Sequence, residues 1–253
     1  MKRSFLAVAS TMLIAAASPA LAIDICVEGA YPPFSVTAED GSIQGFDIDI
    51  ANALCDEMGV SCEMVKVDWD GIIPALLEQK CDAIVASMSI TPDRAQVIDF
   101  TNKYYNTPAR LVAEEGTDLV DSPEGLAGKR IGVQRGSIHH GYVESAFPES
   151  SAIYYNTQDE AHLDLIAGRV DAVMADAVVL DLGFLQTPDG EGFAFFGEPH
   201  YDPEHHGEGV GIGVRKQDGE LRENLNAAIA AIRANGAYEA IGAKYFDFDI
   251  YGE

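Results

Sequence analysis

The chain has 253 residues, with 16 Lys and Arg against 41 Asp and Glu, so its formal net charge is −25 at pH 7. This acidity excludes binding to nucleic acid and electrostatic adsorption to an anionic membrane, because both depend on positive charge. It favours solubility and long-range attraction of cations, but it does not identify a ligand.

The first 22 residues have the pattern of a secretory signal peptide. Lys2 and Arg3 precede an apolar run that ends in Ala20-Leu21-Ala22. The alternative, an anchor helix, would need a longer apolar run with fewer small residues. We therefore expect cleavage after Ala22. This removes two cations and no acid, which leaves a net charge of −27 on residues 23–253.

Short apolar runs alternate with helical patterns along the rest of the chain. The runs IDICV, CEMVKV, CDAIVA, RIGV and VDAVMA predict strands. Apolar residues recur every fourth position from Phe46 to Met58, and Gly59 is suited to end that helix. A second helix is expected to begin near Asp70 as its N-cap, with Pro74 in or near the first turn. The alternation indicates an α/β chain with mixed, mainly parallel sheets flanked by helices.

Four cysteines in an exported chain make disulfides possible. Cys55 and Cys62 lie seven residues apart across the end of the first predicted helix, and we expect them to pair. Cys26 lies inside a strand pattern and Cys81 begins another, so we interpret both as small buried side chains and not as a second disulfide. The sequence has no CxxC motif, so nothing in the cysteine spacing indicates a zinc site or redox catalysis.

An internal repeat is the most informative feature of the sequence. LLEQKCDAIVAS, residues 76–87, matches LIAGRVDAVMAD, residues 165–176, without a gap. Ser87 and Asp176 both fall just past the C-terminal end of the repeated strand, where ligand crevices form in open α/β sheets. A weaker match between ICVEG and IGVQRG places Glu28 opposite Gln134.

Two copies of one unit predict two lobes. We assign residues 23–106 and 210–253 to the first lobe and residues 110–203 to the second, with hinges near 107–109 and 204–209. Residues 210–216 resemble a returning strand, and residues 221–246 form one long helical stretch that we expect to pack on the first lobe. A chain that crosses twice between lobes behaves as a hinged clamshell.

Arg94 is a candidate anion receptor. Thr91 and Pro92 have the pattern of an N-cap and first helical residue, so Arg94 falls in the first turn, where the helix dipole disfavours a cation. The position makes sense if Arg94 holds a carboxylate. The alternative is an ordinary surface arginine paired with Asp93 or Asp99.

Asp176 is the matching candidate on the other lobe. It follows the apolar residues 173–175, and a carboxylate in that setting needs a partner. An α-ammonium group would provide one, with neutral hydrogen bonds from Ser87 and Ser89. The pair Arg94 and Asp176 therefore predicts a site for an α-amino acid.

Three further side chains surround this predicted site. Tyr31 and Trp69 could sandwich a ligand side chain and attract a cationic one, or they could be packing aromatics. Glu28 could neutralise a cationic ligand tail or be a solvent-facing turn residue.

The pairs His139-His140 and His205-His206 suggest a metal site only superficially, because neighbouring side chains point apart and no third ligand has suitable spacing. We interpret them as polar loop residues, with His139 at the cleft margin.

The sequence resembles the periplasmic amino-acid-binding proteins of ABC importers. The resemblance rests on GFDIDIANALC with Cys62, on SMSITPDR, on LIAGRVDAVMAD and on KYFDFDIYG, and it covers essentially the whole chain after the leader. The branch that binds lysine, arginine, ornithine or histidine is most similar, and its disulfide corresponds to Cys55 and Cys62. The resemblance implies a type II periplasmic clamshell joined by two hinge strands, a periplasmic location, no cofactor or metal, and an inner-membrane ABC permease as partner of a monomer.

The resemblance also implies roles for individual residues. Arg94 would bind the ligand carboxylate and Asp176 the ammonium, with Ser87 and Ser89 in support. The family often has threonine at the position of Ile138. Because isoleucine lacks the hydroxyl, only the backbone N–H of Ile138 could serve the carboxylate.

The residues that would surround the ligand side chain depart more from the family pattern. Tyr31 and Trp69 would sandwich the ligand, and Glu28 stands where the branch has an aspartate for the distal positive charge. Ala86 replaces a serine, and Gln134 replaces an apolar residue. Glu28, Trp69 and Gln134 are also similar to opine-binding members, so the expected ligand is arginine, lysine, ornithine, histidine or an arginine-derived opine.

Two other functions share this scaffold. A cyclohexadienyl dehydratase has a similar fold, but Glu28 and Asp176 are the only obvious acids of the predicted cleft and are better explained as charge partners. No GxSxG, HExxH or Cys-His signature is present, so we expect no enzymatic activity. A sensory role, with docking to a receptor in place of a permease, stays open.

Overall fold

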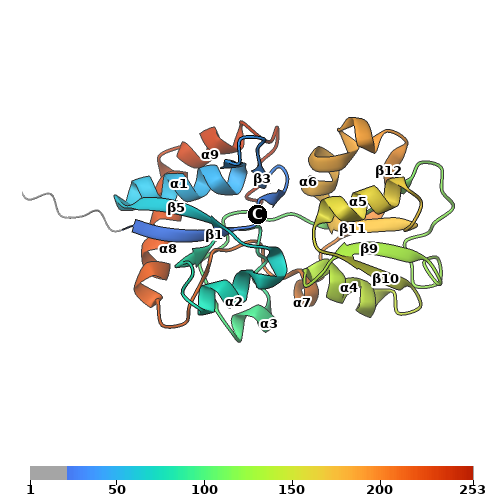
Figure 1. The fold of residues 1–253 in the computed structure, drawn as a ribbon, viewed down its shortest axis with the longest axis horizontal. Coiled ribbons are helices and arrows are strands. Elements are labelled where there is room, and N and C mark those ends of the chain that lie inside the picture. The colour runs from blue at the N-terminus through green and yellow to red at the C-terminus, as the bar shows by residue number, and fades with distance from the viewer. Residues whose placement is uncertain (1–21, 253) are drawn as a thin grey trace, which may run out of the picture.

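The computed structural model describes residues 22–252 and has two lobes side by side, each built around a five-stranded sheet (Figure 1). The predicted leader lies outside the described residues except for Ala22, which begins strand β1. Within residues 22–252, every helix is too short or too polar to cross a membrane.

The sheet of the first lobe has the strand order β5-β1-β6-β13-β7. Strand β1 pairs in parallel with β5 and β6, whereas β13 is antiparallel to β6 and β7. A small antiparallel sheet, β2-β3-β4, follows β1. The bounds are β1 Ala22–Val27, β2 Ala30–Tyr31, β3 Ser35–Thr37, β4 Ile43–Gln44, β5 Ser61–Lys66, β6 Ala83–Ile84, β7 Asp99–Phe100 and β13 Gly213–Val214.

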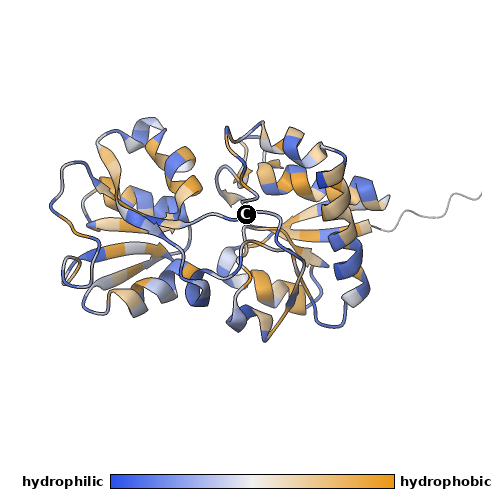
Figure 2. Cartoon of the chain, turned by 180° about the vertical axis from the view of Figure 1, so that it is seen from behind, coloured by the Kyte–Doolittle hydropathy of each residue, from blue (hydrophilic) through white to orange (hydrophobic). Residues whose placement is uncertain are grey.

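Helices cover this sheet, and apolar residues gather in the interior between them (Figure 2). Gly59 ends the first helix with a left-handed φ of 69°, as the sequence predicted. The second helix begins later than Asp70, because a 3-10 turn, η1 Trp69–Gly71, comes first and Gly71 is the N-cap. The expected long C-terminal helical stretch is two helices, since Gly236 takes a φ of 82° between them. The bounds are α1 Phe46–Met58, α2 Ile72–Leu77, α3 Pro92–Ala95, α8 Gly219–Ala234 and α9 Ala237–Gly242.

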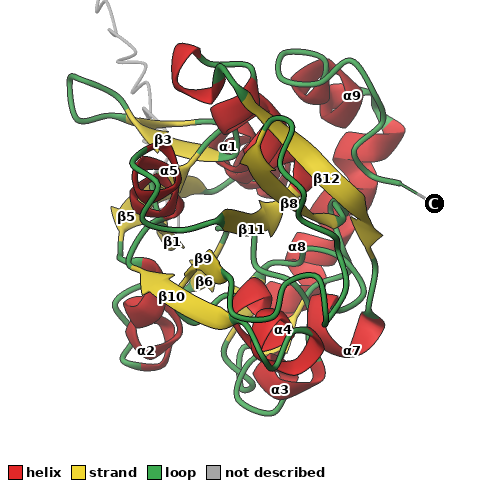
Figure 3. Cartoon of the chain, turned by 90° about the vertical axis from the view of Figure 1, so that its right-hand side faces the viewer, coloured by secondary structure: helices red, strands yellow, loops and turns green. Residues whose placement is uncertain are grey.

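The sheet of the second lobe has the order β10-β9-β11-β8-β12, with β9 parallel to β10 and β11 and β8 antiparallel to both of its neighbours. Helices α4 and α5 lie on opposite faces of this sheet (Figure 3). The strands are β8 Ala109–Glu114, β9 Arg130–Gln134, β10 Ser151–Tyr155, β11 Ala172–Asp176 and β12 Phe193–His200. The helices are α4 Ile138–Ala146, α5 Gln158–Ile166, α6 Ala177–Leu180, η2 Asp181–Leu185, η3 Pro188–Gly190 and α7 Pro203–His206.

The sequence repeat occupies equivalent places in the two lobes. In each lobe the repeated segment runs from the end of a helix, α2 or α5, into a strand, β6 or β11. Each of these strands pairs in parallel with the lobe's earlier strand, β1 or β9. The chain just beyond β6 and the end of β11 therefore hold equivalent positions in their lobes.

The chain crosses twice between the lobes, in residues 101–108 and, after α7, in residues 207–212. The two connections run side by side, because Tyr105 and Val210 form an antiparallel bridge. The C-terminal segment joins them, since Asn106 N donates to Ile250 O at 3.0 Å. The hinge positions near 107–109 and 204–209, and the lobe limits drawn from them, stay predictions.

Two disulfides lie in the first lobe. Cys55 pairs with Cys62, as predicted, and this bond joins the end of α1 to β5. The interpretation of Cys26 and Cys81 as unpaired is wrong, because these two also form a disulfide. Their Cα atoms are 5.6 Å apart, within the range that a disulfide can bridge, since β1 and β6 are neighbouring strands.

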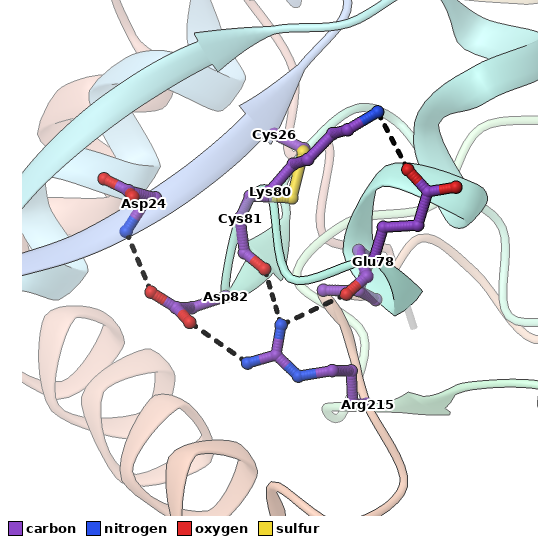
Figure 4. Close-up of a disulfide and its surroundings, with 8 residues drawn as sticks. Asp24, Cys26, Glu78, Lys80, Cys81, Asp82 and Arg215 are labelled. Carbon is purple, nitrogen blue, oxygen red and sulfur yellow. Dashed lines mark hydrogen bonds and ion pairs between the residues drawn. A yellow bond between two sulfur atoms is a disulfide. The ribbon is translucent and has the colours of Figure 1, made fainter.

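The Cys26–Cys81 bond belongs to a wider junction between three strands (Figure 4). The buried Arg215 guanidinium, just after β13, donates to Cys81 O and forms an ion pair with Asp82. The carboxylate of Asp82 also accepts from the backbone N–H of Asp24 in β1. The start of β6 is thus fixed to β1 and β13, which stabilises the strands that lead to the site.

Candidate functional site: a pocket between the lobes

A pocket lies between the lobes, with about 300 Å³ of space that protein atoms do not fill, including space open to solvent. All nine residues that the sequence predicted for ligand binding line it, together with Ala86, Ser137 and His139. The predicted residues are Glu28, Tyr31, Trp69, Ser87, Ser89, Arg94, Gln134, Ile138 and Asp176. The structure thus brings them together, whereas the roles assigned to them stay predictions.

The carboxyl ends of four strands supply the core of this pocket. Glu28 follows β1 directly, and Ser87 comes three residues after β6. Gln134 and Asp176 are the last residues of β9 and β11. This is the edge at which open α/β sheets bind ligands, so the parallel part of each sheet positions the site.

Arg94 provides the positive charge of the pocket. Thr91 caps α3 by accepting from Arg94 N, and Pro92 is the first helical residue, as predicted. The guanidinium donates from Nη1 to Ser89 O at 3.0 Å, and its Cζ lies 5.2 Å from the centre of the Trp69 ring. Loss of hydration lowers the pKa of Arg94 to about 10, and the charge of Asp176 opposes this. Arg94 therefore stays charged at neutral pH and can receive a carboxylate.

Asp176 provides a negative charge from the second lobe and is buried. Its Oδ2 accepts from the Tyr31 hydroxyl at 2.7 Å, and its Oδ1 accepts from the Thr107 hydroxyl at 2.8 Å. The Nε2 atom of His139 lies 3.8 Å from Oδ2. Burial alone would raise the pKa of Asp176, but His139 and the two hydroxyls together hold it below its usual value. Asp176 is thus a carboxylate at neutral pH and can receive an ammonium group.

Glu28 is a second acid of the pocket, and it is buried, with 4% of its surface exposed. Its Oε1 accepts from Gln134 Nε2 at 2.5 Å, a contact across the lobes. Burial raises the pKa of Glu28 to about 7, although the bond from Gln134 acts in the opposite direction. The interpretation of Glu28 as a solvent-facing turn residue is excluded. A cation at this position would favour the charged form of Glu28.

The remaining predicted residues complete the walls. Tyr31 lies in β2 and joins the lobes through its bond to Asp176, and Trp69 opens η1. Ile138 is the first residue of α4, after the N-cap Ser137, and the first N–H groups of a helix have no partner within it. Ser89 contributes its carbonyl to Arg94.

The histidine pairs lie on helices, so their interpretation as loop residues is wrong. His139 belongs to α4 and His206 to α7, and both are buried. Burial lowers the pKa of His206 to about 4. In the described part of the chain, no group of three or more His, Cys, Asp or Glu residues could hold a metal ion.

Two contributors to the site were not predicted from the sequence, whereas His139, expected at the cleft margin, does line the pocket. Thr107 donates a hydrogen bond to Asp176 from the first connection between the lobes. Asp47, in α1, accepts hydrogen bonds from Ser87. A signal for Asp47 was present, because it falls on the same helical stripe as the apolar residues Ala51 and Leu54.

Comparison with known proteins gives one family over nearly the whole described chain. The model of the bacterial extracellular solute-binding proteins, family 3, matches residues 23–248. An L-arginine-binding protein of Pseudomonas aeruginosa is 53% identical over 91% of this chain and 90% of its own length. The lysine/arginine/ornithine-binding periplasmic protein of Escherichia coli K12 is 38% identical over the full length of both chains.

Solved structures give the same picture. An ancestral arginine-binding protein bound to arginine has a TM-score of 0.82 and 35% identity, over 89% of this chain and 98% of that one. An ancestral amino-acid-binding protein, described as a precursor of cyclohexadienyl dehydratase, has a TM-score of 0.79 and 28% identity, over 89% of this chain and 95% of that one. These neighbours share the two-lobed type II architecture expected from the sequence.

Proposed function

The chain belongs to the bacterial extracellular solute-binding proteins of family 3, and we propose that it captures L-arginine in the periplasm and delivers it to an ABC permease of the inner membrane. The observation that carries this proposal is the placement of charges in one pocket. Arg94 offers a carboxylate receptor, Asp176 an ammonium receptor, and Glu28 a third, separate charge.

This arrangement suits arginine among the cationic amino acids. The Glu28 carboxylate, held by Gln134, can accept from a guanidinium, and the planar guanidinium is matched to a carboxylate in a way that an ammonium is not. The aromatic ring of Trp69 adds a surface for a flat cation. The close similarity to an L-arginine-binding protein supports the same choice.

Opines are the second ligand class that the sequence left open. An opine carries a substituent on the α-nitrogen, which would have to lie beside Asp176. Both oxygens of Asp176 already accept hydrogen bonds from Tyr31 and Thr107, and His139 packs beside them. The crowding around this carboxylate favours the unsubstituted α-ammonium of arginine.

Catalysis is the alternative from another class, and the dehydratase precursor among the structural neighbours is the observation that favours it. We propose that this chain is a binding protein, because each acid of the pocket has a role as a charge partner and the similar proteins are named for binding. Turnover of prephenate or arogenate by the purified protein would contradict this.

We propose that the two lobes close on the ligand. Hydrogen bonds between side chains join them directly, from Tyr31 to Asp176 and from Gln134 to Glu28. Both acids are charge partners that we assign to arginine, so ligand and closure involve the same groups. A closed liganded form is what a permease, or a sensory receptor, would recognise.

A thermal-shift screen over the amino acids, octopine and nopaline tests the ligand. A ligand at a hundredfold excess over its Kd stabilises the folded state by about 2.7 kcal/mol. We expect the largest rise in Tm with L-arginine. A larger rise with an opine or with a neutral amino acid would refute the assignment.

A further inference from the structure

Asp47 is a buried carboxylate just behind the pocket wall. It is the second residue of α1, its side chain is fully buried, and it does not line the pocket. Its Oδ2 accepts from Ser87 N at 2.7 Å and from Ser87 Oγ at 3.0 Å. Its Oδ1 accepts from the Tyr104 hydroxyl at 2.8 Å. Asp47 therefore joins a pocket residue to the first connection between the lobes.

The contact with Asp47 explains the backbone of Ser87. Ser87 has a φ of 52°, in the left-handed region that a residue with a side chain rarely adopts. Both its N–H and its hydroxyl are directed at one carboxylate oxygen, and a buried carboxylate must keep its donors. Asp47 thus holds Ser87 in this conformation at the pocket wall.

The same contact fixes the hydrogen-bonding polarity of Ser87. A hydroxyl has one proton, and the proton of Ser87 Oγ is given to Asp47, so only lone pairs are left for another partner. The Tyr31 hydroxyl likewise gives its proton to Asp176. The hydroxyls of Ser87 and Tyr31 and the carboxylate of Asp176 therefore offer acceptors alone. An ammonium group has three donors and no acceptor, which is the complement of this wall.

We infer that Asp47 is a positioning residue that keeps the Ser87 hydroxyl as an acceptor and so makes the pocket selective for ligands with a charged α-amino group. This inference rests on the proposed function as an arginine-binding protein. It assigns to Asp47 a share of the discrimination between an amino acid and the same molecule without its amino group.

The test compares L-arginine with 5-guanidinopentanoic acid, which lacks the α-amino group, by titration calorimetry at pH 8. Asp47→Ala frees the Ser87 proton to point into the pocket. We expect affinity for arginine to fall about ten- to a hundredfold, the effect of one hydrogen bond to a charged group. Affinity for the desamino compound should change less than about threefold, because it makes no such bond.

Asp49→Ala is the matched control. Asp49 lies in the same helix but accepts from Lys244 and Tyr245, away from the pocket. We expect both affinities to stay at the native values in this variant. An equal loss for arginine and the desamino compound in Asp47→Ala would overturn the inference, because it would show a structural role only.

Ser87→Gly keeps the inference testable if Asp47→Ala does not fold. Glycine retains the N–H for Asp47 and adopts a φ of 52° without strain, but it lacks the hydroxyl. We expect the same selective loss of arginine affinity. Native selectivity in this variant would overturn the inference but not the proposed function. If the native protein binds no arginine, the proposed function fails and the inference fails with it.

Discussion

Replacing Glu28 by Gln separates the charge at the distal end of the pocket from its shape. The substitution is isosteric, and the new amide oxygen can still accept from Gln134 Nε2, as Glu28 Oε1 does at 2.5 Å. What disappears is one buried negative charge. The change therefore acts in opposite directions on the unliganded protein and on the arginine complex.

The unliganded protein should gain stability. Burial raises the pKa of Glu28 from 4.5 to about 7. The folded state therefore keeps a proton that the unfolded state has lost, and this lowers the free energy of unfolding as pH rises from about 4.5 to 7. Above pH 7 the full cost of the buried charge is present, on the order of 3 kcal/mol at most. At pH 7.5, Glu28→Gln should recover part of that cost.

Arginine binding should weaken in the same variant. Loss of one partner from a buried, hydrogen-bonded charge pair costs about 2–5 kcal/mol, which is at least about thirtyfold in Kd. Citrulline has a neutral urea in place of the guanidinium, so its affinity should change less than about threefold. The native protein should also bind arginine more weakly below pH 7, where Glu28 is protonated, and this dependence should be reduced in the variant.

Titration calorimetry with both ligands and urea unfolding from pH 5 to 8 measure these effects. Glu63→Gln is the matched control, because Glu63 is exposed on β5 and lies outside the pocket. The reasoning is refuted if Glu28→Gln loses arginine and citrulline affinity equally, or if its stability profile has the same pH dependence as the native protein.

Other predictions test the rest of the site and the fold. Arg94→Ala should abolish detectable arginine binding in calorimetry, since the carboxylate loses its charged partner, and near-native affinity would contradict this. Asp176→Ala should do the same for the ammonium group, as judged by the same titration. Replacing Cys26 and Cys81 by Ala should cost up to about 4 kcal/mol in urea unfolding, because the bond closes a 55-residue separation; a loss below about 1 kcal/mol would contradict the estimate. Small-angle X-ray scattering should show no larger radius of gyration with arginine than without it, and expansion would contradict closure.

The sequence repeat made the pocket predictable. Parallel strands of one sheet end at the same edge, so the ends of repeated units come together when two lobes face each other. Ser87 and Asp176 are separated by 89 positions, yet their equivalent places in the repeat located both. The weaker match of Glu28 with Gln134 proved informative as well, since these two side chains form a hydrogen bond.

Contacts that depend on strand order or on helix orientation escaped prediction. Cys26 and Cys81 pair because β6 lies beside β1, and no pattern near either cysteine reports which strands are neighbours. Asp47 falls on the apolar stripe of its helix, and this position indicates burial but not what the side chain contacts. Only the structure shows that Asp47 accepts hydrogen bonds from Ser87.

The aromatic residues show a third limit of prediction from the sequence. The sequence predicted that Tyr31 and Trp69 flank the ligand, and both line the pocket. It could not predict that the Tyr31 hydroxyl bonds Asp176 in the other lobe, or that the Arg94 guanidinium lies over the Trp69 ring. Such contacts depend on rotamers and on the relative placement of the lobes.

A crystal structure of the protein with L-arginine tests the central claim most directly. We predict the ligand carboxylate at hydrogen-bond distance from Arg94, the α-ammonium on Asp176, and the guanidinium on Glu28. A ligand bound in the reverse direction, with its guanidinium on Asp176, or bound outside this pocket, would contradict the account.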